Sequence, residues 1–342
     1  MNRRSFIGLA GAAVVGSQLP ACGSTEKELA ADAPRSSFDK NSTADEVLEG
    51  IDLSGKLALV TGCTSGIGFE TMRALASHGA HVVGTSRSLQ KAATACHEIA
   101  GNATPLQLEL SDFESVNGCA DAFRAMDAPL DILICNAGFL GGKGKPELID
   151  GVEKHFVINH LGHFLLVNRL LNPLLESEQG RIVMLSSRAA YTSAPGVGIE
   201  FDNLDAHRDY GDRRAYGHSK LANALVALQL SKNLKNTSVT ANAVHPGVIN
   251  TEIDRNMNRF IQGGFAVATA LGFGKSIEQG AATTCHVAAS PALSKTSGKF
   301  FEDCNAVTIV NKGHVHDAEM AAKLWQVSEE MTGDYLLTDN SV

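Results

Sequence analysis

Short apolar runs alternate with stretches of helical periodicity through most of the chain. The runs occupy residues 56–60, 81–85, 104–110, 131–135, 180–185 and 239–244, with 298–301 as the candidate for a seventh. Apolar runs of this length are typical of strands that are buried on both faces of a parallel sheet. Strands that alternate with helices predict an α/β fold. We therefore expect a single doubly wound domain with a mostly parallel, seven-stranded sheet.

The first 22 residues follow a different pattern. Arg3 and Arg4 precede an apolar run at 7–15, and small residues lead to Cys22. A positive start, a short apolar run and a small-residue end are the order of an export signal. The run is shorter than the ~20 residues of a transmembrane helix. The arginine pair resembles a twin-arginine signal, and residues 19–22 resemble a lipoprotein cleavage box in which Cys22 is acylated.

Export predicts a periplasmic or membrane-anchored protein in a bacterium, with an uncleaved anchor or a cytoplasmic protein as the alternatives. Residues 23–45 are polar and mixed in composition, and include Pro34. This composition predicts a flexible linker. One folded domain is then expected over residues 46–342, because single α/β domains reach this length.

Composition narrows the possible functions. The basic residues are scattered and the formal net charge is −8. We expect no nucleic-acid binding, because that function needs a basic patch or stripe. The seven cysteines show no metal-like pair spacing, so no metal site is predicted. Their odd number argues against a complete disulfide framework, and buried free thiols are expected for all except Cys22.

A glycine-rich loop follows the first strand of the pattern. Gly62, Gly66 and Gly68 stand between the run at 56–60 and a stretch of helical periodicity. Glycines between a strand and a helix let a pyrophosphate approach the backbone and the helix N-terminus. The spacing differs from the Gly-x-Gly-x-x-Gly of the ordinary Rossmann fingerprint. We predict a dinucleotide site in a Rossmann-type domain, with a simple tight turn as the alternative.

The end of the second strand indicates which cofactor is bound. Ser86 and Arg87 stand there, and neither is acidic. An acidic residue at this position holds the ribose 2′-hydroxyl of NAD, whereas a nearby arginine accommodates the 2′-phosphate of NADP. The sequence therefore favours NADP(H), with a solvated loop charge as the alternative for Arg87.

Tyr216 and Lys220 are the candidate chemical centre. Side chains four residues apart lie on one face of a helix, so the phenol and the ammonium can meet. A fixed cation favours the phenolate and lowers the pKa of a phenol from its usual value near ~10. Such a tyrosine can exchange a proton with a substrate oxygen near neutral pH. A surface Tyr–Lys pair is the alternative.

Together these motifs resemble the short-chain dehydrogenase/reductase superfamily over roughly residues 52–330. The set that carries the resemblance is Thr61-Gly62-x3-Gly66-Ile67-Gly68, Asn136-Ala137-Gly138, Asn159, Ser187, Tyr216-x3-Lys220 and Pro246-Gly247. The chain is most similar to the retinol-dehydrogenase-like branch, on Asn159-His160-Leu161-Gly162-His163-Phe164 and on His245-Pro246-Gly247-Val248.

The resemblance implies four catalytic residues. Tyr216 would donate a proton in reduction and accept one in oxidation. Lys220 would lower the pKa of Tyr216 and bind the nicotinamide ribose. Ser187, rather than Ser186, would hydrogen-bond the substrate oxygen. Asn159 would hold a water in a proton relay behind Lys220.

The resemblance also implies a set of cofactor contacts. One residue departs from the family pattern, because Glu109 stands where the family usually has an aspartate against the adenine. The implied cofactor-binding residues are Gly62, Ser65, Gly66, Ile67, Gly68, Arg87, Glu109, Leu110, Asn136, Ala137, Gly138, Tyr216, Lys220, Pro246, Gly247, Val248 and Thr251.

Two segments are expected to form the substrate pocket, at 188–214 and 250–275. The second is apolar but short for a membrane span, so we interpret it as a lid helix. An apolar lid suits a lipophilic aldehyde, ketone or alcohol. Core packing or a homo-oligomer surface is the alternative for these apolar residues.

The predicted function is NADP-dependent interconversion of an alcohol with an aldehyde or ketone. Two other functions remain open. One is a nicotinamide-binding sensor without turnover. The other is reduction of a carbon–carbon double bond.

Overall fold

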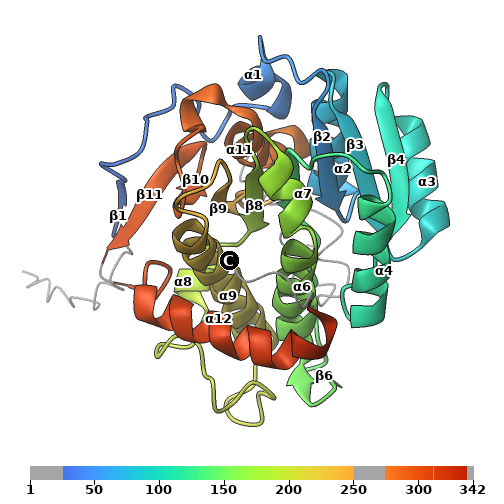
Figure 1. The fold of residues 1–342 in the computed structure, drawn as a ribbon. Coiled ribbons are helices and arrows are strands. Elements are labelled where there is room, and N and C mark those ends of the chain that lie inside the picture. The colour runs from blue at the N-terminus through green and yellow to red at the C-terminus, as the bar shows by residue number, and fades with distance from the viewer. Residues whose placement is uncertain (1–25, 250–273, 311, 337–342) are drawn as a thin grey trace, which may run out of the picture.

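The computed structural model describes residues 26–249, 274–310 and 312–336 (Figure 1). Its centre is a nine-stranded sheet with the order β1-β11-β10-β9-β8-β5-β2-β3-β4. The strands are β1 Glu26–Leu29, β2 Leu57–Thr61, β3 His81–Ser86, β4 Asn102–Gln107, β5 Ile132–Cys135, β8 Arg181–Leu185, β9 Thr240–His245, β10 Phe300–Glu302 and β11 Asn305–Val310.

The seven strands from β10 to β4 run parallel, which confirms the predicted α/β fold. Two antiparallel strands extend the predicted sheet at one edge. β11 returns from β10 through Asp303 and Cys304, whose positive φ angles of 51° and 61° close the tight turn. β1 then pairs with β11.

Helices cover both faces of the sheet. The longer ones are α2 Gly66–Ser77, α3 Leu89–Glu98, α4 Phe113–Arg124, α6 Gly162–Arg169, α9 Asp212–Asn233, α11 Ile277–Ala289 and α12 Ala318–Thr332. Shorter elements are α1 Ala44–Leu48, the β6–β7 hairpin at Leu148–Ile149 and Val152–Glu153, α5 Lys154–Phe156, a π-helix at Val157–Leu161, α7 Leu171–Glu176 and α8 Ala189–Thr192. Among the residues described, no helix is both long and apolar enough to span a membrane.

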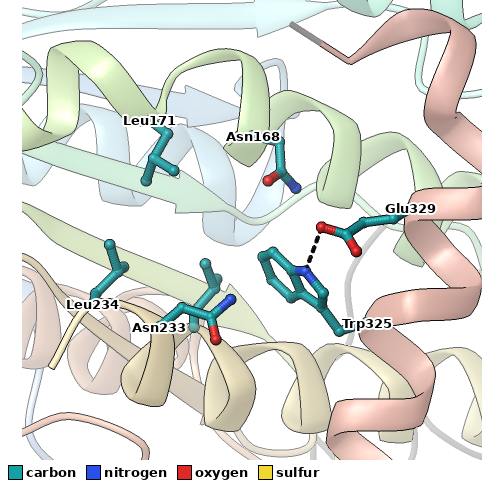
Figure 2. A pocket seen from close by; sticks show the side chains of 7 residues that line it. Asn168, Leu171, Asn233, Leu234, Trp325 and Glu329 are labelled. Carbon is teal, nitrogen blue, oxygen red and sulfur yellow. Dashed lines mark hydrogen bonds between the residues drawn. The ribbon is translucent and has the colours of Figure 1, made fainter. Parts of the chain in front are cut away.

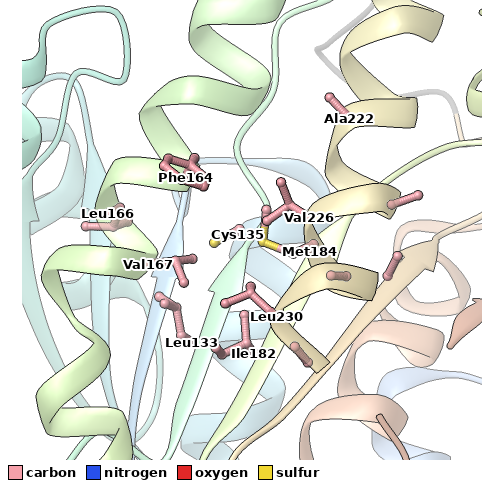
Figure 3. Close-up of a cluster of buried hydrophobic side chains, with 14 of the residues drawn as sticks. Leu133, Cys135, Phe164, Leu166, Val167, Ile182, Met184, Ala222, Val226 and Leu230 are labelled. Atoms are coloured by element: carbon pink, nitrogen blue, oxygen red, sulfur yellow. The ribbon is translucent and has the colours of Figure 1, made fainter. Parts of the chain in front are cut away.

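The buried side chains form one hydrophobic core on each face of the sheet. Successive residues of a strand point to opposite faces, so Leu133 enters the core under α4, α6 and α9, whereas Ile132 and Ile134 enter the core under α2, α3 and α11. Figure 3 shows the first core, where Leu133 lies near side chains of β8, α6 and α9. This packing holds the strand ends, and therefore the loops after them, in fixed positions.

The C-terminal helix α12 is fastened by Trp325. Its ring packs edge-on against Phe164 at 4.8 Å between centroids, and its indole nitrogen donates to Glu329 at 2.7 Å. A small pocket beside it is lined by Asn168, Leu171, Leu230, Asn233 and Leu234 (Figure 2). Asn233 ends α9, 17 residues or about 25 Å along the helix from Tyr216. This pocket is therefore remote from the predicted chemical centre.

The predicted flexible linker at 23–45 is wrong for the part that the structure describes. From Glu26 the chain forms β1, Ala30 is buried, and Thr43 and Glu46 make a capping box that starts α1. The polar composition concealed this, because β1 is a charged edge strand held by main-chain pairing and not by apolar side chains. The predicted export signal at 1–22 lies outside the described residues.

β1 also contributes one ion pair to the domain. Lys27 Nζ lies 2.7 Å from Oε1 of Glu302, whose side chain is 6% exposed and also accepts from the hydroxyl of Tyr191 at 3.1 Å. The carboxylate is buried at the end of β10, so it depends on Lys27 for a compensating charge.

Lys27→Ala is expected to lower the free energy of unfolding by about 1–2 kcal/mol. The loss stays below that of a fully buried pair, because the Lys27 side chain is 45% exposed and partly screened by water. Urea unfolding measures it, with the neighbouring exposed Glu28→Ala as the control. Equal stability of the two variants would show that the ion pair contributes nothing.

Candidate active site

The glycine loop joins β2 to α2 at the carboxyl edge of the sheet. Gly62 and Gly66 have φ angles of 72° and 58°, in the left-handed region that favours glycine. A Cβ at Gly68 would lie 2.1 Å from the Gly62 carbonyl oxygen. Within the described structure, the side chain of the N-cap residue Ser65 does not cap α2. The loop therefore fits a phosphate, because close backbone approach and an uncapped helix start both favour an anion.

Asn136 and Ala137 follow β5 and hold this loop. The Asn136 amide donates to the carbonyls of Thr61 and Gly62 at 2.8 and 3.3 Å. The main-chain N–H of Ala137 donates to the Thr61 hydroxyl at 2.9 Å. The side chain of Asn136 thus shapes the glycine loop from the neighbouring strand, and Gly138 continues the chain past it.

Tyr216 and Lys220 lie one helical turn apart near the start of α9. The Lys220 Nζ is 5.7 Å from the Tyr216 ring centroid and donates to the Leu185 carbonyl at 2.9 Å. Lys220 is 3% exposed, and this burial lowers its pKa to about 8. The ammonium is therefore still mostly charged at neutral pH, and a cation at this distance stabilises a phenolate. Burial rules out the alternative of a surface pair.

The two serines after β8 differ in their hydrogen bonds. Ser186 is buried and donates its hydroxyl to the Lys220 carbonyl at 2.7 Å. Ser187 is half-buried, and its oxygen accepts from the main-chain N–H of Ala189 at 3.2 Å. That bond leaves the hydroxyl proton of Ser187 for another acceptor, which favours the predicted choice of Ser187.

Asn159 is fully buried in the π-helix, and its side chain has protein partners on both ends. Its Oδ1 accepts from the Phe139 N–H at 2.6 Å, and its Nδ2 donates to the Phe139 carbonyl and to Ser219 Oγ at 3.0 and 2.9 Å. Ser219 in turn donates to the Tyr216 carbonyl at 2.8 Å. Both amide hydrogens thus join two segments, and the expected role of Asn159 in holding a water stays a prediction.

Arg87 and Glu109 stand after β3 and β4. Arg87 is exposed, and its carbonyl accepts from Gln107 at 3.2 Å. Glu109 lines a surface groove between β4 and α4, but its Oε1 accepts from the main chain and hydroxyl of Ser111 at 3.1 and 2.7 Å. The Glu109 carboxylate is therefore turned toward its own loop, which leaves Oε2 for a ligand.

The remaining predicted cofactor residues differ in accessibility. The Leu110 side chain is buried, so a ligand could reach only its main chain. Pro246 and Gly247 follow β9, with Gly247 at φ 106°, and Val248 is half-exposed. The Val248 carbonyl accepts from the Lys275 N–H at 3.0 Å. Ile67 is the second residue of α2, and Thr251 lies outside the described residues.

Most of the predicted site residues follow the carboxyl ends of parallel strands, where ligands bind in open α/β sheets. Three residues that hold them together, Thr61, His163 and Ser219, stand in the sequence motifs, but sequence reasoning gave them no role in the site. A histidine inside an apolar helix was the available signal for His163, but spacing alone does not reveal its partners.

A doubly wound fold with this glycine loop, and with a tyrosine and a buried lysine one turn apart, defines a short-chain dehydrogenase/reductase. The chain belongs to that family, whose members bind nicotinamide cofactors. A family model described as short chain dehydrogenase matches residues 56–199.

Several proteins of known sequence or structure are similar to the chain. The chain is 42% identical over 311 residues to the chloroplastic short-chain dehydrogenase TIC 32 A of Brassica napus, covering 86% of this chain and 94% of that one. It is 40% identical over 288 residues to retinol dehydrogenase 12 of Mus musculus, covering 83% and 88%. A crystal structure of an uncharacterized protein from Mycobacterium Paratuberculosis superposes with a TM-score of 0.67 at 29% identity, covering 86% and 98%.

Proposed function

We propose that this protein is an NADP(H)-dependent oxidoreductase that interconverts an alcohol with an aldehyde or ketone. The observation that carries the proposal is the buried Lys220 ammonium beside the Tyr216 ring, with the half-buried Ser187 at the end of the adjoining strand. Membership of the short-chain dehydrogenase/reductase family supports oxidoreductase chemistry. The test is a screen of purified protein with NADPH and a panel of medium-chain and aromatic aldehydes and ketones.

A bound nicotinamide cofactor would supply the hydride in the reductive direction. Ser187 donates a hydrogen bond to the carbonyl oxygen, which positions the substrate and stabilises the charge that develops there. Tyr216 donates its phenolic proton to the same oxygen. The Lys220 cation stabilises the phenolate that remains. Oxidation of an alcohol uses the same residues in reverse.

The glycine loop and Lys220 are the residues that would hold the cofactor. Gly62, Gly66 and Gly68 leave room for the pyrophosphate at the start of α2, and Lys220 would contact the nicotinamide ribose. Arg87, exposed after β3, would bind the 2′-phosphate that distinguishes NADPH from NADH.

Arg87→Ala is expected to raise the KM for NADPH about tenfold and to leave the KM for NADH nearly unchanged, because only NADPH loses a charge-assisted hydrogen bond. Steady-state kinetics with both cofactors measure this. Lys235→Ala removes another exposed positive charge, beyond the far end of α9, and controls for net charge. A parallel change for both cofactors would contradict the NADP assignment.

A lipophilic substrate is proposed from the sequence alone. The apolar segment expected to form a lid, 250–275, lies almost wholly outside the described residues, and its composition suits an apolar alcohol or carbonyl. If turnover in the screen rises with substrate chain length, the lid interpretation is supported. A preference for charged or short polar substrates would contradict it.

We also propose export, with Cys22 as a lipid-attachment residue. Cys22 lies four residues before β1, so an attached lipid would hold the sheet edge within about 14 Å of the anchor, even with the intervening chain fully extended. A twin-arginine signal exports folded proteins, so the cofactor would travel bound.

Fractionation of cells tests the export proposal. The wild type is expected in the membrane fraction and Cys22→Ala in the soluble periplasmic fraction. Wholly cytosolic wild-type protein would refute export.

A further inference from the structure

His163 is a fully buried histidine that the proposed proton transfer does not use. It lies in the first turn of α6. Its Nε2 is 2.9 Å from the Thr61 hydroxyl, and its Nδ1 is 3.0 Å from the Asn159 carbonyl oxygen. The imidazole therefore bridges the residue that precedes the glycine loop and the π-helix that faces α9.

These contacts indicate which atom donates and which accepts in each hydrogen bond around His163. A carbonyl oxygen only accepts, so His163 Nδ1 carries a hydrogen, and in a neutral imidazole Nε2 is then an acceptor. The single Thr61 hydroxyl proton has two possible acceptors, Nε2 at 2.9 Å and the Ile134 carbonyl at 3.4 Å, and we assign it to the nearer Nε2. The Thr61 oxygen accepts from the Ala137 N–H at 2.9 Å. The neutral Nδ1–H tautomer satisfies each of these groups.

His163 stays neutral at the pH where the enzyme would work. Burial lowers its pKa to about 4; the hydrogen bond to the Asn159 carbonyl opposes this shift, and the nearby Lys220 cation adds to it. The imidazole is therefore neutral near pH 7, and its contacts are those of a connector between Thr61 and the Asn159 carbonyl.

Each end of this connector leads into the proposed site. On one side, the Thr61 carbonyl accepts from Asn136, and Gly62 begins the cofactor loop. On the other, the side chain of Asn159 holds Ser219, which bonds the Tyr216 carbonyl.

His160 provides an internal comparison on the preceding turn. It is equally buried, but its Nε2 bonds Ser328 of α12 at 2.9 Å, and its ring packs on Phe156. It thus fastens the C-terminal helix and does not touch the glycine loop. Burial alone does not distinguish the two histidines, whereas their partners do.

We propose that His163 is a positioning residue that couples the cofactor loop to the catalytic helix by holding Thr61 and the Asn159 carbonyl in one fixed arrangement. The proposal rests on the proposed oxidoreductase function for its effect on kcat. The predicted change in cofactor affinity and the predicted tautomer of His163 do not depend on which substrate is used.

The experiment compares His163→Leu with His160→Leu. His163→Leu is expected to raise the Kd for NADPH about tenfold and to lower kcat by at least about tenfold, because each lost hydrogen bond displaces a segment of the site. His160→Leu is expected to lower the melting temperature while keeping both values within about twofold of wild type. Equal effects of the two variants on Kd and kcat would overturn the proposal.

His163→Asn separates the two links. Its amide can still donate toward the Asn159 carbonyl but is too short to reach Thr61. It should therefore recover kcat more than NADPH affinity. A variant that behaves like His163→Leu in both values would overturn the assignment.

The imidazole ¹⁵N shifts of the wild type give a readout that needs no variant to fold. The Nδ1–H tautomer, neutral down to about pH 5, is expected, and the Nε2–H tautomer would overturn the arrangement. If the wild type turns over no carbonyl substrate, the proposed function fails, while NADPH affinity and the tautomer still decide the role of His163.

Discussion

Tyr216→Phe is expected to lower kcat by about 10²–10⁴-fold, the range that a positioned general acid contributes. The ring that packs beside Lys220 remains in the variant. The Kd for NADPH should therefore change by less than about threefold, because only one hydrogen-bonding group is lost. Stopped-flow oxidation of NADPH measures the first quantity, and quenching of protein fluorescence measures the second.

Ser186→Ala is a matched control for this variant. It also removes one hydroxyl, but that hydroxyl already bonds the Lys220 carbonyl inside the fold. Ser186→Ala should lower the free energy of unfolding but change kcat little. If Tyr216→Phe keeps wild-type turnover on every substrate, Tyr216 is not the proton donor.

Lys220→Met is expected to abolish most activity and yet to stabilise the cofactor-free protein at pH 7. Burial lowers the pKa of Lys220 from 10.5 to about 8, so folding carries a cost of roughly 3 kcal/mol while the lysine is charged in both states. Methionine fills similar space without a charge. The stabilisation should be smaller than this cost, because the hydrogen bond to the Leu185 carbonyl is lost.

The difference in stability between the wild type and Lys220→Met should depend on pH. Between pH 8 and 10.5 the unfolded chain binds more protons than the folded one, so the stability of the wild type rises with pH through this window. The advantage of Lys220→Met should therefore be largest below pH 8 and should be lost before pH 10.5, where only the missing hydrogen bond to Leu185 remains. Urea unfolding at pH 7 and pH 10 measures it. If the variant is less stable than the wild type at pH 7, and by the same amount at pH 10, Lys220 is not a buried charged lysine.

The parallel sheet could be predicted because its strands are apolar on both faces. Leu57–Thr61 and Arg181–Leu185 are buried throughout, so continuous apolar runs marked them. β1 could not be found in this way, since Glu26–Leu29 is three-quarters charged and pairs through its main chain. The expected strand at 104–110 is shifted to Asn102–Gln107 for the same reason, because β4 is an edge strand with no buried residue.

The positions of the site residues followed from spacing, but their contacts did not. Tyr216 and Lys220 are one helical turn apart in any helix, whereas the burial of Lys220 depends on the packing of β8 and α9. The hydrogen bonds of the Asn159 side-chain amide are made with Phe139 and Ser219, which lie 20 and 60 residues away. Long-range contacts of this kind leave no periodic signal in the chain.

Transfer of deuterium from NADPH labelled at the nicotinamide C4 tests the central claim most directly. An α,β-unsaturated aldehyde that the protein turns over serves as the substrate, and mass spectrometry locates the label in the product. We predict one deuterium on the carbinol carbon, with transfer slowed by about 10²–10⁴-fold in Tyr216→Phe. Deuterium on the β-carbon would identify a double-bond reductase, and tight NADPH binding with no transfer to any carbonyl would identify a sensor; either result would contradict the proposed alcohol–carbonyl oxidoreductase.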